Sequence, residues 1–132
     1  MSLNRGKTKA NFVKEINKKL KQQNMFNLFS TETKAYKSLN GKEFKEEYLK
    51  SKQPVLIDVR TAAEFASGSI NNAKNIDVLS LDFKKQLNSL DMEKEYFLFC
   101  RSGNRSGQAC SMMAEQGFKV YNLKGGIGAW PK

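Results

Sequence analysis

The chain of 132 residues contains no histidine and only two cysteines, Cys100 and Cys110. The missing histidine excludes a Ser-His-Asp triad, a Cys-His pair and any histidine metal site. Two cysteines are too few for a disulfide framework. Any cysteine chemistry must therefore be activated by backbone dipoles and by arginine, and we expect neither a metal nor another cofactor.

Long hydrophobic runs are also missing. No apolar stretch approaches the roughly 18 to 20 residues that cross a bilayer, and the N-terminus has no apolar segment of the secretory type. We therefore expect a cytoplasmic protein without a transmembrane segment. The leading Met1-Ser2-Leu3 is typical of an expression leader, so a natural targeting segment before it could have been removed.

The net charge of +10 is concentrated at the N-terminus. Residues 1–24 carry seven basic side chains against one acidic side chain, whereas residues 25–132 carry a net charge of only +4. The length suits a single domain with a proper core. We therefore divide the chain into a basic N-terminal arm, residues 1–29, and one domain, residues 30–132.

Within the arm, Phe12, Val13, Ile16 and Leu20 recur at helical spacing, which predicts an amphipathic helix with a lysine-rich outer face. The favoured interpretation is a docking helix whose charges are solvated. Weak contact with an anionic lipid surface is the alternative. Nucleic-acid binding is not expected, because the arm lacks dense basic residues interleaved with aromatic ones.

Strand-like and helix-like segments alternate along the domain. Val55-Leu56-Ile57-Asp58-Val59 is a near-continuous apolar run, typical of a parallel strand buried on both faces. Thr61-Ala62-Ala63-Glu64 has capping-box spacing, so a helix follows at once and ends near Gly68. Repetition of this pattern predicts an α/β domain with a small central parallel sheet and helices on both faces. The other predicted elements are helices over 40–50, 81–90 and 108–116 and strands over 96–99 and 120–123.

The stretch from Cys100 to Ser106, Cys-Arg-Ser-Gly-Asn-Arg-Ser, joins a predicted strand to a predicted helix. A cysteine at that junction lies at a helix N-terminus, where free N–H groups and the helix dipole stabilise an anion. Arg101 and Arg105 add positive charge, and Gly103 lets the backbone turn its amides inward. These features should lower the thiol pKa of Cys100 and make its thiolate a nucleophile.

Two further expectations concern the cysteines. We expect the N–H groups of the loop, rather than its carbonyls, to face the sulfur of Cys100, and we expect that sulfur to be open to solvent. Cys110 lies among apolar residues of the predicted helix with no positive charge beside it. An inert core thiol is therefore favoured there over a resolving cysteine.

Three stretches, in order, resemble the signatures of the rhodanese (thiosulfate sulfurtransferase) family. Asp58-Val59-Arg60, with Glu64-Phe65 and Gly68-Ser69-Ile70, is similar to the first signature. Cys100 to Ser106 resembles the active-site loop, and Leu123-Lys124-Gly125-Gly126 with Trp130 resembles the closing motif. Together they span residues 55–130. The one departure is Ser69, where the family commonly has histidine.

The resemblance implies a rhodanese-like domain and a double-displacement mechanism. The Cys100 thiolate would attack the outer sulfur of a donor such as thiosulfate, release sulfite and become a persulfide. Cyanide or a thiol would then accept the sulfur. The loop amides would cradle the persulfide, while the two arginines bind the dianionic donor and Ser106 caps the helix. The implied substrate-binding residues are Arg101, Ser102, Gly103, Asn104, Arg105 and Ser106.

Asp58 and Arg60 are predicted to support the site. Asp58 ends a buried strand, so accepting backbone N–H bonds is favoured over an acid–base role. Arg60 is four residues before Glu64, which favours an ion pair between them over a contact with an anion in the pocket. Trp130 is expected to fill the core rather than to stack on substrate.

Two alternatives remain. A cysteine phosphatase or arsenate reductase of the same fold needs C-x5-R, whereas Cys100 and Arg105 have C-x4-R spacing and no aspartate follows in the loop as a general acid. A non-catalytic persulfide carrier or partner-binding module would have the same loop and would exchange sulfur with a protein donor or acceptor. The expected partners of the enzyme are a small-molecule sulfur donor and a thiol or cyanide acceptor.

Overall fold

The computed structural model describes residues 9 and 36–132. The predicted arm over 1–29, its amphipathic helix and the domain boundary at residue 30 fall outside these residues, Lys9 excepted. The Lys9 ammonium donates to Asn88 Oδ1 at 2.7 Å. In the described part of the chain, no helix combines the length and the apolar character needed to span a bilayer.

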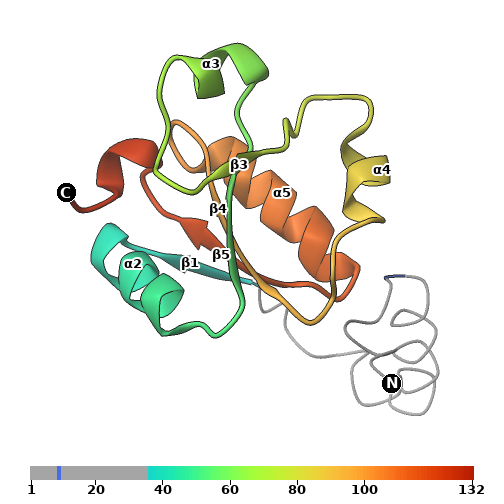
Figure 1. The fold of residues 1–132 in the computed structure, drawn as a ribbon, viewed down its shortest axis with the longest axis horizontal. Helices are drawn as coiled ribbons and strands as arrows, with labels where there is room; N and C mark the ends of the chain where they lie inside the picture. Colours follow the sequence, from blue (N-terminus) through green and yellow to red (C-terminus); the bar gives the residue numbers. More distant parts are fainter. Residues whose placement is uncertain (1–8, 10–35) are drawn as a thin grey trace, which may run out of the picture.

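A parallel sheet forms the centre of the described domain (Figure 1). Its strands lie in the order β1-β5-β4-β2-β3, and every neighbouring pair is parallel. The strands are β1 Lys37–Leu39, β2 Pro54–Asp58, β3 Lys74–Asn75, β4 Glu95–Phe99 and β5 Lys119–Leu123. The helices are α2 Gly41–Lys50, α3 Ala62–Ala66, α4 Phe83–Leu87, α5 Asn104–Glu115 and the 3-10 turn η2 Ile127–Ala129.

Both faces of the sheet are covered, because alternate residues of the apolar strands point to opposite sides. On one face, Leu98 packs with Phe83 of α4 and Met113 of α5. On the other face, Phe97 packs with Phe44 of α2 in an edge-to-face contact of 5.5 Å between ring centroids. Burial of each such side chain contributes about 2 kcal/mol. The predicted α/β architecture with helices on both faces is confirmed.

Trp130 belongs to the α2 side of this core. Its ring meets those of Phe44 and Tyr48 edge-on, with centroids 6.1 and 5.9 Å away. The Lys45 ammonium lies 5.3 Å from the centroid of the indole. Trp130 therefore packs against the core, as expected, but it is only partly buried and also lines a pocket.

Capping side chains set the start of two helices. Asn40 Oδ1 accepts from Glu43 N at 2.9 Å at the head of α2, and Thr61 Oγ1 accepts from Glu64 N at 3.2 Å at the head of α3. Both acidic side chains reach back to the cap backbone, which satisfies a second free N–H group. Both predicted capping boxes are confirmed.

Two helix boundaries differ from prediction. The helix expected over 81–90 spans only Phe83–Leu87, because Leu81 is fully exposed and has no core to pack against. The helix expected to start near residue 108 begins at Asn104. Its N-cap is Gly103 and not Ser106, so the prediction that Ser106 caps the helix is wrong.

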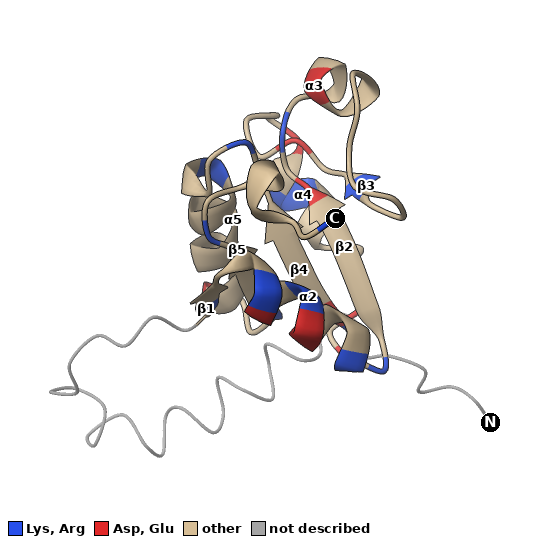
Figure 2. Cartoon of the chain, turned by 90° about the vertical axis from the view of Figure 1, so that its left-hand side faces the viewer, with Lys and Arg blue, Asp and Glu red and all other residues tan. Residues whose placement is uncertain are grey.

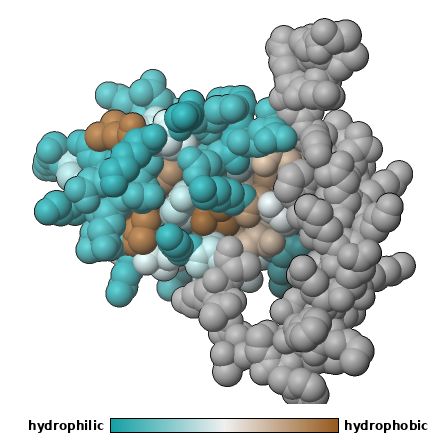
Figure 3. Space-filling model, turned by 90° about the horizontal axis from the view of Figure 1, so that it is seen from below, coloured by the Kyte–Doolittle hydropathy of each residue, from teal (hydrophilic) through white to brown (hydrophobic). Residues whose placement is uncertain are grey.

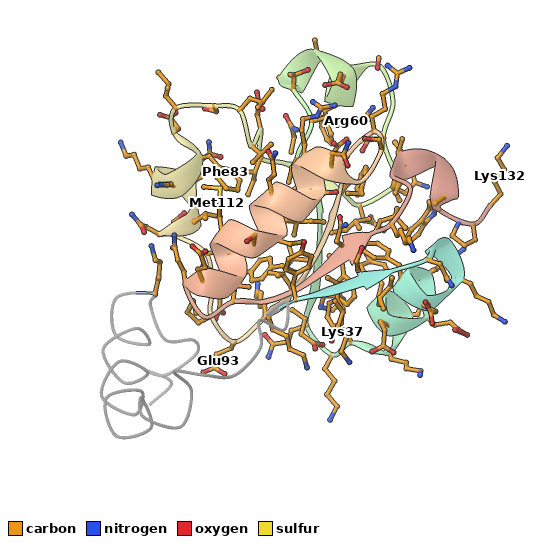
Figure 4. The ribbon with its side chains drawn as sticks, turned by 180° about the vertical axis from the view of Figure 1, so that it is seen from behind. Lys37, Arg60, Phe83, Glu93, Met112 and Lys132 are labelled. Atoms are coloured by element: carbon orange, nitrogen blue, oxygen red, sulfur yellow. The ribbon has the colours of Figure 1, made fainter. Side chains whose placement is uncertain are left out.

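The described surface is polar and mixed in charge. Acidic and basic residues alternate along α2 (Figure 2). Seen from below, hydrophilic residues dominate the described part of the surface, and the hydrophobic patches are small and separate (Figure 3). Figure 4 labels Arg60 and Glu93, which mark opposite ends of the sheet: Arg60 follows β2, and Glu93 precedes β4.

Candidate active site

The loop that carries Cys100 lies at the carboxyl end of the sheet. β4 ends at Phe99 and α5 begins at Asn104, so the loop crosses from the middle strand to a helix within four residues. A backbone hydrogen bond of 3.0 Å from Val59 N to Phe99 O joins the end of the adjacent strand β2 to the end of β4. Ligand sites of open parallel sheets lie at this edge.

The segment after β5 closes the loop from one side. Ile127 N donates to the carbonyl of Cys100 at 2.8 Å, so that oxygen is bonded to the segment after β5. Gly126 has φ of 80°, and a Cβ there would lie only 2.0 Å from the carbonyl oxygen of Arg101. Only glycine permits so close an approach, so the closing motif acts as a clamp on the loop.

Hydrogen-bond donors converge on the sulfur of Cys100. Gly103 N donates to Sγ at 3.0 Å, and Ser106 Oγ lies 3.3 Å from Sγ. Burial raises the pKa of the Cys100 thiol, but bonds from the Ser106 hydroxyl and from the amides of Ser106, Gly103 and Ser102 outweigh it and leave the pKa below its usual value. The prediction that N–H groups face the sulfur is confirmed.

The expectation of a sulfur open to solvent is wrong. Cys100 has an exposed fraction of 0% and belongs to the buried cluster beneath α4 and α5. The same tight closure that brings the amides onto the sulfur therefore also shields it.

The two loop arginines differ in their surroundings. Arg101 is exposed and forms no ion pair with any described residue. Arg105 forms a bidentate pair with Glu64, with Nη1–Oε1 at 2.8 Å and Nη2–Oε2 at 3.1 Å. The pair raises the pKa of Arg105 and lowers the pKa of Glu64 to about 2. Donor binding by Arg105 thus stays a prediction, and its guanidinium is engaged in this structure.

The predicted ion pair between Arg60 and Glu64 is wrong. Arg60 instead forms a bidentate ion pair with Asp58, with Nε–Oδ1 at 2.9 Å and Nη2–Oδ2 at 2.7 Å. Its Nη2 also donates to the carbonyl of Gly68 at 2.7 Å. Burial explains the choice: Asp58 is completely buried and needs a charged partner, whereas Glu64 is partly exposed.

Asp58 accepts the kind of backbone bond that the sequence predicts and has one partner that sequence reasoning missed. Its Oδ1 accepts from Arg60 N at 3.0 Å, which confirms the expected backbone bond. Its Oδ2 accepts from Ser69 Oγ at 2.8 Å. Ser69 occupies the position where the resembled family commonly has histidine, and that departure was the available signal. The three side chains join the end of β2 to the segment after α3.

Asn122 of β5 is the other residue that sequence reasoning missed. It is 5% exposed, and its Oδ1 lies 2.5 Å from Ser106 Oγ, behind the sulfur. A polar residue within an apolar strand was the signal, since buried amides must find partners.

The remaining predicted residues lie on the rim. Ser102 and Asn104 line a cavity of about 470 Å³ that also borders Asn122, Gln108 and Lys124. The cavity lies on the β1 and β5 side of the loop. Its lining includes residues 102–104 of the loop and α5 start, but not Cys100.

Cys110 lies on α5 within the core. Its exposed fraction is 0%, and burial raises the pKa of its thiol. This placement agrees with the expected core thiol. No group of three potential metal ligands occurs among residues 9 and 36–132.

Comparison with known proteins assigns the domain. The sequence profile of the Rhodanese-like domain matches residues 41–132. The chain is 39% identical over 94 residues to the "Putative sulfurtransferase YtwF" of Bacillus subtilis, covering 71% of this chain and 89% of that protein. It is 36% identical over 84 residues to "Thiosulfate sulfurtransferase GlpE" of Ectopseudomonas mendocina, covering 62% and 74%.

A solved structure shows the same fold. The crystal structure of a Rhodanese-like domain protein from Staphylococcus aureus superimposes with a TM-score of 0.63 at 34% identity, covering 73% of this chain and 92% of that one. The family profile itself covers every element from α2 to η2 and so includes the loop that carries Cys100. This chain belongs to the Rhodanese-like domain family.

Proposed function

We propose that this protein is a sulfurtransferase that carries a sulfane sulfur as a persulfide on Cys100. One observation carries the proposal: Cys100 Sγ receives the Gly103 amide at 3.0 Å at the N-terminus of α5, where a negative charge is stabilised. The names of the two relatives support sulfur transfer as the reaction, and the second supports thiosulfate as a donor.

The reaction needs no proton transfer by a side chain. The Cys100 thiolate attacks the outer sulfur of thiosulfate, an S–S bond to Cys100 forms, and the bond to the inner sulfur breaks. Sulfite leaves with the electron pair of that bond. Cyanide or a thiolate then attacks the terminal sulfur, and the Cys100 thiolate is restored. The missing histidine is therefore no obstacle to this chemistry.

Access to the sulfur is the additional requirement. Cys100 is fully buried, so the first step must include opening of the loop. Arg101 is exposed on the loop and provides a positive charge to attract a dianionic donor. Loop opening on the microsecond to millisecond scale is common in enzymes and can precede chemistry.

The burial of Cys100 favours one second candidate, a persulfide carrier whose loop opens against a protein partner. Such a carrier would turn over thiosulfate and cyanide slowly, but would exchange its persulfide rapidly with a protein thiol. Steady-state kinetics with both kinds of substrate separate the two functions. The phosphatase alternative is disfavoured, because the loop closes on a single sulfur and the guanidinium of Arg105 is paired with Glu64.

Intact-mass spectrometry after incubation with thiosulfate tests the proposal. We expect one added sulfur, mapped to Cys100 by peptide analysis and removable by cyanide. The matched pair of variants is Cys100→Ser, which should accept no sulfur, and Cys110→Ser, which should accept it as the wild type does. Sulfur found on Cys110, or on neither cysteine, refutes the assignment.

A further inference from the structure

Asn122 is fixed beside the active-site loop by the sheet. Its backbone lies in register with Leu98 of β4 on one side and with Ser38 of β1 on the other. Its side chain contacts Ser106 of α5 and the carbonyl of Gly103, so it lies beneath the N-terminus of that helix. Strand β5 therefore contributes a polar group directly behind the loop.

Three side chains form a chain of close contacts that ends at the reactive sulfur. Cys100 Sγ lies 3.3 Å from Ser106 Oγ, and Ser106 Oγ lies 2.5 Å from Asn122 Oδ1. Ser106 is completely buried. A hydroxyl group has a single proton, so a full hydrogen bond from Ser106 goes either to the sulfur or to the amide oxygen, and each weakens the other.

The orientation of the Asn122 amide follows from its other neighbours. Its Nδ2 donates to Ser38 Oγ at 3.1 Å and to Gly103 O at 3.4 Å. The opposite orientation would press Oδ1 against the Gly103 carbonyl, one acceptor against another. The acceptor end of the amide therefore faces Ser106.

We propose that Asn122 is a positioning residue that competes with Cys100 for the single proton of Ser106 and thereby sets how readily the thiol ionises. In the thiol form, Cys100 S–H donates to Ser106 Oγ, and Ser106 donates to Asn122. When the thiol loses its proton to solvent, the Ser106 hydroxyl rotates to the sulfur, and Asn122 Oδ1 loses that donor. Ionisation of Cys100 therefore costs the bond between Ser106 and Asn122.

The competition matters for the catalytic cycle, so this inference rests on the proposed function. In the persulfide, the negative charge moves to the outer sulfur, and the inner sulfur no longer needs the proton of Ser106. The hydroxyl can then return to Asn122. Asn122 thus stabilises the thiol and persulfide forms relative to the free thiolate.

Substitution at position 122 leaves the charged and titratable groups of the loop and of the neighbouring elements in place. On α5 these are Arg105 and Cys110, in the loop Arg101, and on α3 Glu64, which pairs with Arg105. The Asp58–Arg60 pair follows β2, and Asp77 precedes α4 and acts on Arg105. A change in the Cys100 titration caused by Asn122 can therefore be separated from theirs.

The test is a pH titration of the thiolate absorbance. It is performed in a Cys110→Ser background, and the absorbance of a Cys100→Ser variant is subtracted. Asn122→Leu removes the competing acceptor, and we expect the pKa of Cys100 to fall by about 0.5 to 1 unit, the equivalent of one neutral hydrogen bond. Asn122→Asp holds the proton more strongly and adds a negative charge, and we expect the pKa to rise by about 1 unit or more. The neighbouring cavity gives both side chains room.

A double-mutant cycle distinguishes competition for a proton from a general effect on structure. In a Ser106→Ala background, Asn122→Leu should leave the pKa of Cys100 unchanged, because no shared proton remains. The matched control is Gln108→Leu, which makes the same kind of change in the same cavity without touching Ser106 and should not move the titration.

Two results overturn the inference: a pKa that rises or stays constant in Asn122→Leu, or a shift that persists without Ser106. If Asn122→Leu fails to fold, the direction of the shift in Asn122→Asp decides the matter, and a fall or no change contradicts the inference. The proposed function is tested separately, by the pKa of Cys100 in the wild-type protein. A wild-type Cys100 that titrates at the ordinary thiol value counts against an activated nucleophile, whatever position 122 does.

Discussion

Arg105 and Glu64 form a bidentate ion pair, with distances of 2.8 and 3.1 Å, that ties the first turn of α5 to the capping box of α3. Glu64 thereby serves two helices at once: its Oε1 also accepts from the backbone N–H of Thr61 at 3.2 Å. The pair links the loop that carries Cys100 to the segment after β2. The Glu64 carboxylate therefore contributes both to the stability of this region and to its charge.

The first prediction concerns the pH dependence of stability. The bond with Arg105, foremost, and those with Thr61 lower the pKa of Glu64 from 4.5 to about 2 in the folded protein. A depressed carboxyl pKa gives stability that is complete above the unfolded value and is lost as the pH falls through 4.5 toward 2. In urea unfolding at stepped pH, the wild type should therefore lose stability in this range more steeply than Glu64→Gln.

Glu64→Gln is a fair comparison because glutamine keeps an acceptor for the cap and loses only the titrating charge. Glu95 also has a lowered pKa, caused first by its bond with Lys119, but that pair is unchanged in both proteins. Parallel stability curves for the two proteins below pH 4.5 would show that the ion pair contributes nothing in solution.

The second prediction concerns donor binding. Removal of the Glu64 charge frees the guanidinium of Arg105 beside the loop, so an anionic donor meets one more uncompensated positive charge. We expect the KM of Glu64→Gln for thiosulfate to fall about two- to fivefold, and the difference to shrink as salt screens the charge. Initial-rate kinetics at two ionic strengths measure it. An unchanged KM would mean that Arg105 lies off the path of the donor.

The fold was largely predictable because it rests on local signals. The apolar runs of β2 and β4 and the capping boxes at Asn40 and Thr61 each have a short-range cause, and all of them appear in the structure. The amides around Cys100 follow in the same way from a strand, a glycine and a helix start. Local patterns therefore indicated strands β2 and β4, helices α2 and α3, and the amides that face the sulfur of Cys100.

Long-range choices were not predictable from spacing. Arg60 and Glu64 are four residues apart, yet Arg60 turns to the buried Asp58 and Glu64 turns to Arg105, 41 positions away. Asn122 meets Ser106 only because β5 lies next to β4. The close approach of Gly126 to the carbonyl of Arg101 likewise joins two segments that α5 and β5 separate in the sequence.

The third prediction concerns the buried pair of Asp58 and Arg60. Asp58→Asn leaves the guanidinium of Arg60 buried without its counter-charge, so we expect a loss of about 3 kcal/mol in the free energy of unfolding. The control is Ser69→Ala, which removes only the bond from Ser69 Oγ to Asp58 and should cost about 1 kcal/mol. Urea unfolding at neutral pH compares them. Equal losses in the two variants would show that the ion pair contributes no more to the free energy of unfolding than the hydrogen bond from Ser69.

The fourth prediction concerns the clamp that closes the loop. Gly126→Ala places a Cβ 2.0 Å from the carbonyl oxygen of Arg101 and forces a side chain into φ of 80°, so the loop must shift away from the closing segment. Because a displacement of about 1 Å at a reacting group can cost roughly 100-fold in rate, we expect kcat/KM for sulfur transfer to fall at least tenfold. The matched control is Gly128→Ala, since a Cβ at Gly128 meets no atom within 4 Å. Wild-type activity in Gly126→Ala would show that the loop does not depend on this contact, and equal losses in both variants would point to a general effect of alanine in the η2 segment.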